Sequence, residues 1–116
     1  MVERTNSASG PEKDIDRIRV RSVIKERLRC YLSRDRTGIR REVLRLFVRN
    51  RSLTIAEIVT ELRSQFTVTF QAIASMVGII ASRIGILRAT RNSDCVHNYE
   101  LREKYYGIVV SIVGIN

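Results

Sequence analysis

Apolar residues recur at helical spacing in four stretches of the chain, which predicts four helices before residue 85. The first begins at Asp14 or Asp16 and ends near Ser33, and the second runs from Ile39 to about Arg49. The third follows Thr54 to about Gln65, and the fourth covers 70–83. Their predicted inward faces are Val20, Ile24, Leu28, Tyr31 and Leu32; Ile39, Val43, Leu46 and Phe47; Ile55, Ile58, Val59 and Leu62; and Phe70, Ile73, Val77, Ile80 and Ile84.

Residues that terminate helices stand where these stretches begin and end. Asp35 or Thr37 can cap the second helix, with Gly38 as a flexible joint. Thr54 and Glu57 have the spacing of a capping box, and Thr69 is placed as the next N-cap. Leu53 is expected to be a short extended residue, and Gly85 a left-handed C-cap.

The hydrophobic period changes from helical to two after Gly85. The segments ILRATR and CVHNYEL are therefore predicted to be two strands, joined by a turn at Asn92, Ser93 and Asp94. The last segment, KYYGIVVSIVG, is ambiguous, because its β-branched residues favour a strand while its apolar spacing favours a helix. We predict a helix.

The order of these elements is that of a winged helix-turn-helix. We expect a mainly α fold with a small β-hairpin, in which the helix after the tight turn can enter a DNA major groove and the hairpin forms the wing. Residues 14–116 would form this domain together with the C-terminal apolar helix, and 1–13 would be a flexible N-terminal arm.

Two resemblances are carried by particular segments. RTGIRREVLRLFVRNRSLTIAEIVTELRSQF looks like the opening of ferric-uptake-regulator-like winged helices. RTGIRREVLRLF together with ASMVGIIASRIGILR more closely resembles a family of short, functionally uncharacterised archaeal proteins, found especially in methanogens, over roughly residues 20 to 110. The second resemblance implies a winged-helix fold and supplies no established ligand or catalytic residue.

The basic charge is confined to one part of the chain. The whole sequence has 116 residues and a formal net charge of +9. Between Arg17 and Arg51 there are 13 basic and three acidic residues, whereas the remainder carries eight basic and nine acidic ones. Such an excess favours an anionic partner, nucleic acid before an anionic membrane or an acidic protein.

Three arginines of the second helix are the first candidates for phosphate contacts. Arg41, Arg45 and Arg49 fall one turn apart and are expected on one outward stripe, although like charges at that spacing oppose the helix. The alternative is a solvated stripe or a ladder paired with Glu42. On the hairpin, Arg88 and Arg91 are placed for the same contacts near the wing tip.

The outward face of the fourth helix is almost uncharged. Thr69, Gln71, Ser75 and Ser82 are the candidates for contacts with DNA, of which Gln71 and Ser75 are suited to bond base edges. Small residues such as Gly78 fit close packing against another helix or a second subunit equally well.

The apolar end of the chain predicts an interface. A stripe of five residues suits dimerisation of a winged-helix protein, and the alternative is that it folds back on the first helix. Its members are Tyr105, Ile108, Val109, Ile112 and Val113.

Catalytic and metal chemistry finds little support in the sequence. Cys95 and His97 cannot complete a tetrahedral site and are expected to be ordinary strand residues, while Cys30 and Cys95 are expected to be reduced and partly buried. Nucleotide-loop, hydrolase and metalloprotease motifs do not occur, and Glu57 and Glu61 are interpreted as solvated carboxylates. We expect neither an enzyme nor a cofactor.

The sequence therefore favours a cytoplasmic protein that binds double-stranded DNA and regulates transcription, as a homodimer. A polar start and the lack of an apolar run near 18 residues argue against a signal peptide and a membrane span. The competing hypotheses are an adaptor that docks to a protein of the transcription or replication machinery, and RNA binding along phosphates.

Overall fold

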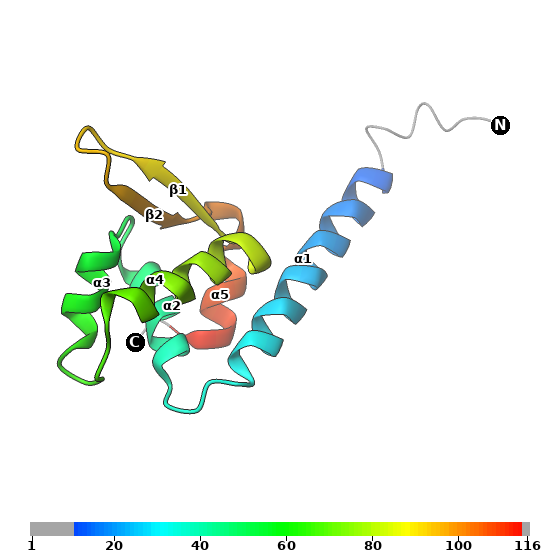
Figure 1. Cartoon of the computed structure of the whole chain (residues 1–116). Helices are drawn as coiled ribbons and strands as arrows, with labels where there is room; N and C mark the ends of the chain where they lie inside the picture. Colours follow the sequence, from blue (N-terminus) through cyan, green and yellow to red (C-terminus); the bar gives the residue numbers. More distant parts are fainter. Residues whose placement is uncertain (1–10, 115–116) are drawn as a thin grey trace.

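The fold consists of helices packed around α2, with a two-stranded hairpin on one side. The computed structural model describes residues 11–114, and Figure 1 shows α1 projecting from the packed body that the other elements form. The helical elements are α1 (Pro11–Leu32), α2 (Ile39–Arg49), α3 (Ile55–Leu62), α4 (Phe70–Ile79), the π-helical turn η2 (Ile80–Ile84), the 3-10 turn η3 (Glu103–Tyr105) and α5 (Tyr106–Val113). The strands are β1 (Leu87–Arg91) and β2 (His97–Leu101). A mainly α fold with a small hairpin is thus confirmed.

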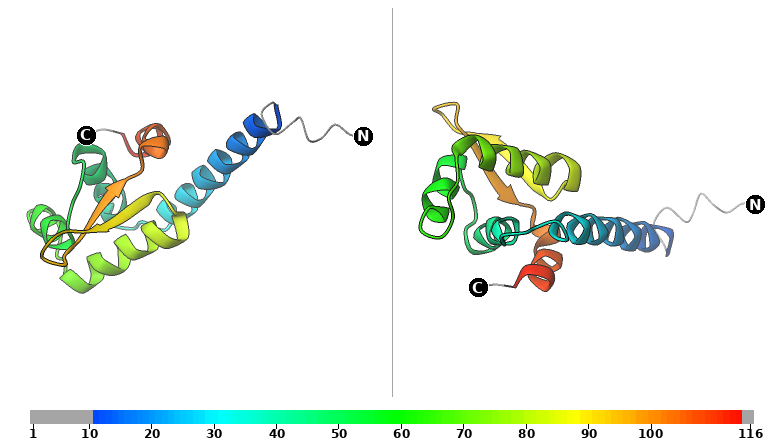
Figure 2. Two further views of the ribbon diagram at one scale, coloured as in Figure 1. Left: turned by 90° about the horizontal axis from the view of Figure 1, so that it is seen from above. Right: turned by 60° about the horizontal axis from the view of Figure 1, so that its bottom comes forward.

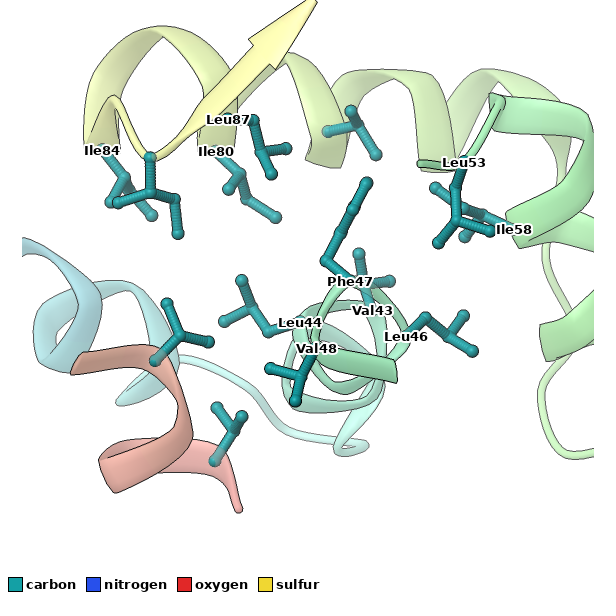
Figure 3. Close-up of a cluster of buried hydrophobic side chains, with 14 of the residues drawn as sticks. Val43, Leu44, Leu46, Phe47, Val48, Leu53, Ile58, Ile80, Ile84 and Leu87 are labelled. Carbon is teal, nitrogen blue, oxygen red and sulfur yellow. The ribbon is translucent and has the colours of Figure 1, made fainter. Parts of the chain in front are cut away.

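Helix α2 forms the centre of the hydrophobic core. It is viewed almost along its axis in Figure 3, where Leu46 points toward Leu53 and Ile58, and Phe47 points toward Leu87. Leu44 and Val48 point to the side where α5 lies. Val43 and Leu44 are fully buried, because α2 contacts α3, α5 and β2 at once.

The predicted helix caps are present as local contacts. The Thr54 hydroxyl accepts from the Glu57 amide at 3.1 Å, and the Glu57 carboxylate accepts from the Thr54 amide at 2.8 Å. Thr69 accepts from the Ala72 amide at 3.1 Å. At α2 the carboxylate of Asp35 accepts from two amides of the first turn, while Gly38 takes a positive φ of 85°.

Helix α1 begins earlier than expected, at Pro11. Residues 11–13 of the predicted N-terminal arm are thus helical, and residues 1–10 lie outside the described range. Toward the other end, Ile24, Leu28 and Leu32 are buried as predicted. The prediction that Val20 points inward is wrong, because this residue is 48% exposed in the part of α1 that projects beyond the body.

Helix α4 departs from its predicted pattern at both ends. Phe70, predicted to point inward, is 57% exposed, since it occupies the first position of the helix and the core begins one turn later at Ile73. After Ile79 the backbone widens into η2, which Gly85 ends with φ of 83°, as expected of a left-handed C-cap. Ile80 and Ile84 are buried.

The hairpin is antiparallel, with Leu87 paired to Leu101 at its base and Arg91 paired to His97 near its tip. Leu53 joins β2 through a bridge to Tyr99, which confirms its extended conformation. Two expectations for Cys95 are wrong: it lies in the turn with φ of 63°, outside both strands, and its side chain is exposed. Cys30 is exposed as well, because it lies on the outer side of α1.

The last predicted helix is confirmed as α5. Its buried residues, Ile108, Val109 and Val113, pack in the core, and the helix contacts α2 and α1. The two views of Figure 2 show α5 on the far side of the molecule from α4.

Candidate nucleic-acid interface

The arginines of α2 make contacts inside the protein. Arg41 donates from Nη1 to the carbonyl oxygen of Ile112 at 2.9 Å, and Arg45 donates from Nε to that of Val113 at 2.7 Å. These oxygens belong to the last turn of α5, where helix carbonyls have no partner in their own helix. The two guanidinium groups therefore fix the end of α5 to α2.

Glu42 pairs with two arginines of the same stripe. Its two carboxylate oxygens lie 3.4 Å from Arg45 and 3.1 Å from Arg49. Arg41, Arg45 and Arg49 therefore do not form one free outward stripe, while their contact with phosphates stays a prediction. The first two are partly buried and held by α5, and Arg49, although exposed, is paired. The alternative, a ladder paired with Glu42, describes the contacts of Arg45 and Arg49 with that carboxylate. The contacts of Arg41 and Arg45 with α5 could not be predicted from the neighbouring sequence.

The outward face of α4 is uncovered. Gln71 and Ser75 are exposed there, one turn apart, and Arg83 is exposed in the turn that follows. Thr69 and Ser82 have partners within their own helix: the Thr69 oxygen caps α4, and the Ser82 hydroxyl donates to the Gly78 carbonyl at 2.7 Å. Of the four predicted contact residues, Gln71 and Ser75 are thus the ones whose side chains make no hydrogen bond with another described residue.

Arg88 and Arg91 do not act as a pair, because they lie three positions apart on a strand and so point to opposite faces of the hairpin. Arg88 is directly opposite Glu100. Arg88 and Glu100 line a cleft of about 510 Å³ between the hairpin, the end of α2 and the start of α5, together with Arg51 and Glu103. The cleft thus brings two guanidinium groups and two carboxylates together, and the phosphate contact of Arg88 stays a prediction.

Arg91 lies on the other face, near the tip of the wing. Its Nη2 is 3.4 Å from His97 Nε2, and the imidazole meets the ring of Tyr99 edge to face with centroids 6.2 Å apart. Arg91 and His97 are both exposed. This end of the hairpin can therefore present one guanidinium and one imidazole to an anion.

The C-terminal stripe expected at a dimer interface is used inside the protomer. Tyr105, Ile108, Val109 and Val113 are at most 7% exposed, and Ile112 is partly buried against the same core. The alternative that this segment folds back is the one observed, with contacts to α1 and, more extensively, to α2. A second copy would have to use another surface.

Sequence reasoning missed the most exposed basic element, the projecting half of α1. Every described side chain from Ile18 to Val23 is exposed, including Arg19 and Arg21, and Arg27 and Arg29 are exposed on the next turns. Arg21 donates to the carbonyl oxygen of Lys104 at 2.9 Å. The run of basic residues could have indicated α1 as a candidate anion-binding surface. The one-turn spacing of Arg41, Arg45 and Arg49 favoured α2 instead.

One tyrosine of α1 is buried without a partner for its hydroxyl. Within the described residues, no group hydrogen-bonds the Tyr31 Oη, while Arg40 stacks on the ring at 4.4 Å. Burial raises the pKa of Tyr31 above its ordinary value, with Asp35 acting in the same direction and Arg40 opposing it. The arrangement is a cation–π contact that joins α1 to the start of α2.

The described part of the chain has neither a group of metal-binding side chains nor a membrane-spanning helix. From Pro11 to Gly114 no three His, Cys, Asp or Glu residues are grouped as ligands of a metal ion. None of the helices in this range combines the length and apolar character that crossing a bilayer requires.

Comparison with known proteins assigns the chain to a family. Residues 28–109 match the model of a family described as "Protein of unknown function (DUF2551)". The chain belongs to this family. A relative from Archaeoglobus fulgidus, described as an uncharacterized protein, is 35% identical over 91 residues, which cover 78% of this chain and 92% of the relative. The family is thus one of uncharacterised archaeal proteins, as its resemblance implied, and no solved structure matches the chain. The DUF2551 match begins at Leu28, so the exposed half of α1 lies outside it.

Proposed function

We propose that this DUF2551 protein is a winged-helix protein that binds double-stranded DNA through α4 and regulates transcription. The observation that carries the proposal is the uncovered polar face of α4, with Gln71 and Ser75 exposed on a helix whose opposite face is anchored in the core. A helix of this kind fits the major groove, where amide and hydroxyl groups can bond base edges.

The surroundings of α4 support this orientation. It contacts α3 directly before it in the chain, joined by residues 63–69, as the two helices of a helix-turn-helix do. The hairpin follows, and its tip carries Arg91 and His97. Arg83 and Arg91 replace the α2 stripe as the phosphate contacts expected beside the reading helix.

The test is a fluorescence anisotropy titration of the full chain against random duplex DNA, single-stranded DNA and double-stranded RNA at two salt concentrations. We expect duplex DNA to be bound more tightly than single strands or RNA, with affinity falling as salt rises. Binding to duplex DNA no tighter than millimolar at physiological salt contradicts the proposal.

The role of α4 is tested separately by selecting preferred duplexes from a random pool. Changing Gln71 and Ser75 to Ala should relax discrimination between the selected and random duplexes by about 1–3 kcal/mol for each side chain that bonds a base edge. Arg91→Gln should instead weaken binding to all sequences alike. An equal decrease in affinity for selected and random DNA in the α4 variant would contradict base reading by α4.

A second candidate, docking of α4 to a protein, is favoured by one side chain. Phe70 is 57% exposed at the start of α4, and exposed aromatic side chains commonly anchor protein interfaces. An adaptor would bind duplex DNA weakly, and Phe70→Ala would abolish binding to its partner. A DNA-binding protein would keep its duplex affinity in that variant.

A further inference from the structure

The reading surface around α4 carries little net charge. Its exposed bases Arg63, Arg83 and Arg91 are offset by the exposed carboxylates of Glu57, Glu61 and Asp94 on α3 and the hairpin turn. Contacts with phosphate supply a large share of the affinity of DNA-binding proteins, through release of counterions. If α4 reads DNA with Arg83 and Arg91 beside it, a further basic element would add to that affinity.

The projecting half of α1 holds that charge in a defined hollow. Arg19, Val20, Val23, Ile24 and Arg27 line a hollow of about 410 Å³ along one side of the helix. Arg27 has no carboxylate within ion-pair distance among the described residues. The two guanidinium groups thus flank an apolar strip of valine methyls, which are 44–48% exposed.

Helical geometry places this hollow on the opposite side of Ile24 from Arg21. At 3.6 residues per turn, Arg27 lies about 60° to one side of the buried Ile24, and Arg21 about 60° to the other. Arg21 contacts the Lys104 carbonyl beside α5, so α5 flanks that edge. The other helical neighbour of α1 is η2, the continuation of α4. Seen from above in Figure 2 (left), α1 leads away from this end of α4.

We propose that the hollow on α1 binds the sugar-phosphate backbone of duplex DNA next to the base pairs that α4 reads. This inference rests on the proposed function. The guanidinium groups match the phosphates, and the valine side chains match the apolar faces of the deoxyribose rings. From Ile18 to Arg29 the helix is about 18 Å long, the length of about five base pairs, so it extends the contact beyond the domain.

Two other occupants fit the hollow less well. A helix that lies on a membrane surface carries its apolar residues on one face. The exposed Ile18 lies about 200° round the helix from Val20, so these two residues cannot both face a membrane. A second copy of α1 would bring like charges together, because the sequence of this helix has seven basic residues against four acidic ones.

The experiment compares the double variant R19Q/R27Q with a control, R102Q/K104Q, that removes two exposed bases beside α5. Anisotropy with 12- and 24-base-pair random duplexes is measured across a salt series. The α1 variant should lower the log–log salt slope on the 24-base-pair duplex by about 1.8, and by less on the 12-base-pair duplex. The control should keep the wild-type slope. Circular dichroism checks that both variants are folded.

The outcomes separate this inference from the function on which it rests. An unchanged slope in R19Q/R27Q, with wild-type binding intact, overturns the role of α1 and leaves DNA binding by α4 standing. A decrease in the control as large as in the α1 variant also overturns it, because net charge alone would then explain the effect. If the wild type binds phosphatidylserine vesicles but not duplex DNA, both proposals fail and the hollow is a membrane contact.

Discussion

The arginines of α1 and α2 belong to one basic stretch of sequence but have opposite fates in the fold. Arg41 and Arg45 on α2 are partly buried and donate to backbone carbonyls of α5, and Arg45 is also paired with Glu42. Arg19 and Arg27 on α1 are exposed along a helix that leaves the body. A run of bases therefore does not reveal which of them can meet an anion. A basic residue is available to an anion only if the fold does not place a hydrogen-bond acceptor of the protein beside it.

The largest expected effect tests the division of α1 into an anchored half and an exposed half. Leu28 is fully buried between α1 and the body, so Leu28→Ala should lower the free energy of unfolding by about 3 kcal/mol. Val20→Ala should change it by less than about 0.5 kcal/mol, since Val20 is half exposed. Urea denaturation followed by circular dichroism measures both. Similar decreases in the two variants would mean that the projecting half is also packed.

An intermediate effect tests the contrast between the two sets of arginines directly. Arg45→Gln removes a charged hydrogen bond to the Val113 carbonyl and should cost about 1–2 kcal/mol of stability while leaving the salt slope of duplex binding unchanged. Arg27→Gln should do the reverse, with stability unchanged and the salt slope lower by about 0.9. Urea denaturation and salt-series anisotropy on the same preparations check the pair. A lower salt slope in Arg45→Gln would contradict this prediction and would mean that Arg45 contacts phosphates.

The smallest expected effect concerns the junction of α1 and α2. Tyr31→Phe removes a buried hydroxyl that has no partner among the described residues, so stability should rise or stay within about 1 kcal/mol of the wild type at pH 7. Because burial raises the pKa of Tyr31 in the folded state, its contribution is complete below about pH 10 and is lost as pH rises through the folded pKa. The variant should lose less stability than the wild type above pH 10. Urea midpoints at pH 8 and pH 11 measure this, and equal decreases would contradict it.

Features that depend on neighbouring residues could be predicted from the sequence. The caps at Thr54 and Thr69, the turn after Arg91 and the left-handed Gly85 each involve groups a few positions apart, and each is present. The hairpin and the last helix followed from hydrophobic period alone. The prediction that Phe70 points inward was wrong, because the hydrophobic pattern indicates which face of a helix is buried but not at which residue the buried part begins.

The candidate site was predicted less well, because its contacts join distant parts of the chain. Arg41 and Arg45 have helical neighbours that suggest an outward stripe, but their acceptors are 71 and 68 residues away. Arg88 and Arg91 are close in sequence, yet strand alternation separates them. The uncovered face of α4 with Gln71 and Ser75 was predictable, because it follows from helical period within a single element.

The contact between α2 and the end of α5 also bears on how the chain folds. Segments about 70 residues apart meet late, since a long loop must close before the contact forms. Until then the guanidinium groups of Arg41 and Arg45 lack their carbonyl acceptors, and the incompletely folded chain presents more free cationic groups than the finished one. A polyanion that reaches the chain at this stage competes with α5 for α2. High concentrations of nucleic acid are therefore expected to slow the formation of this contact.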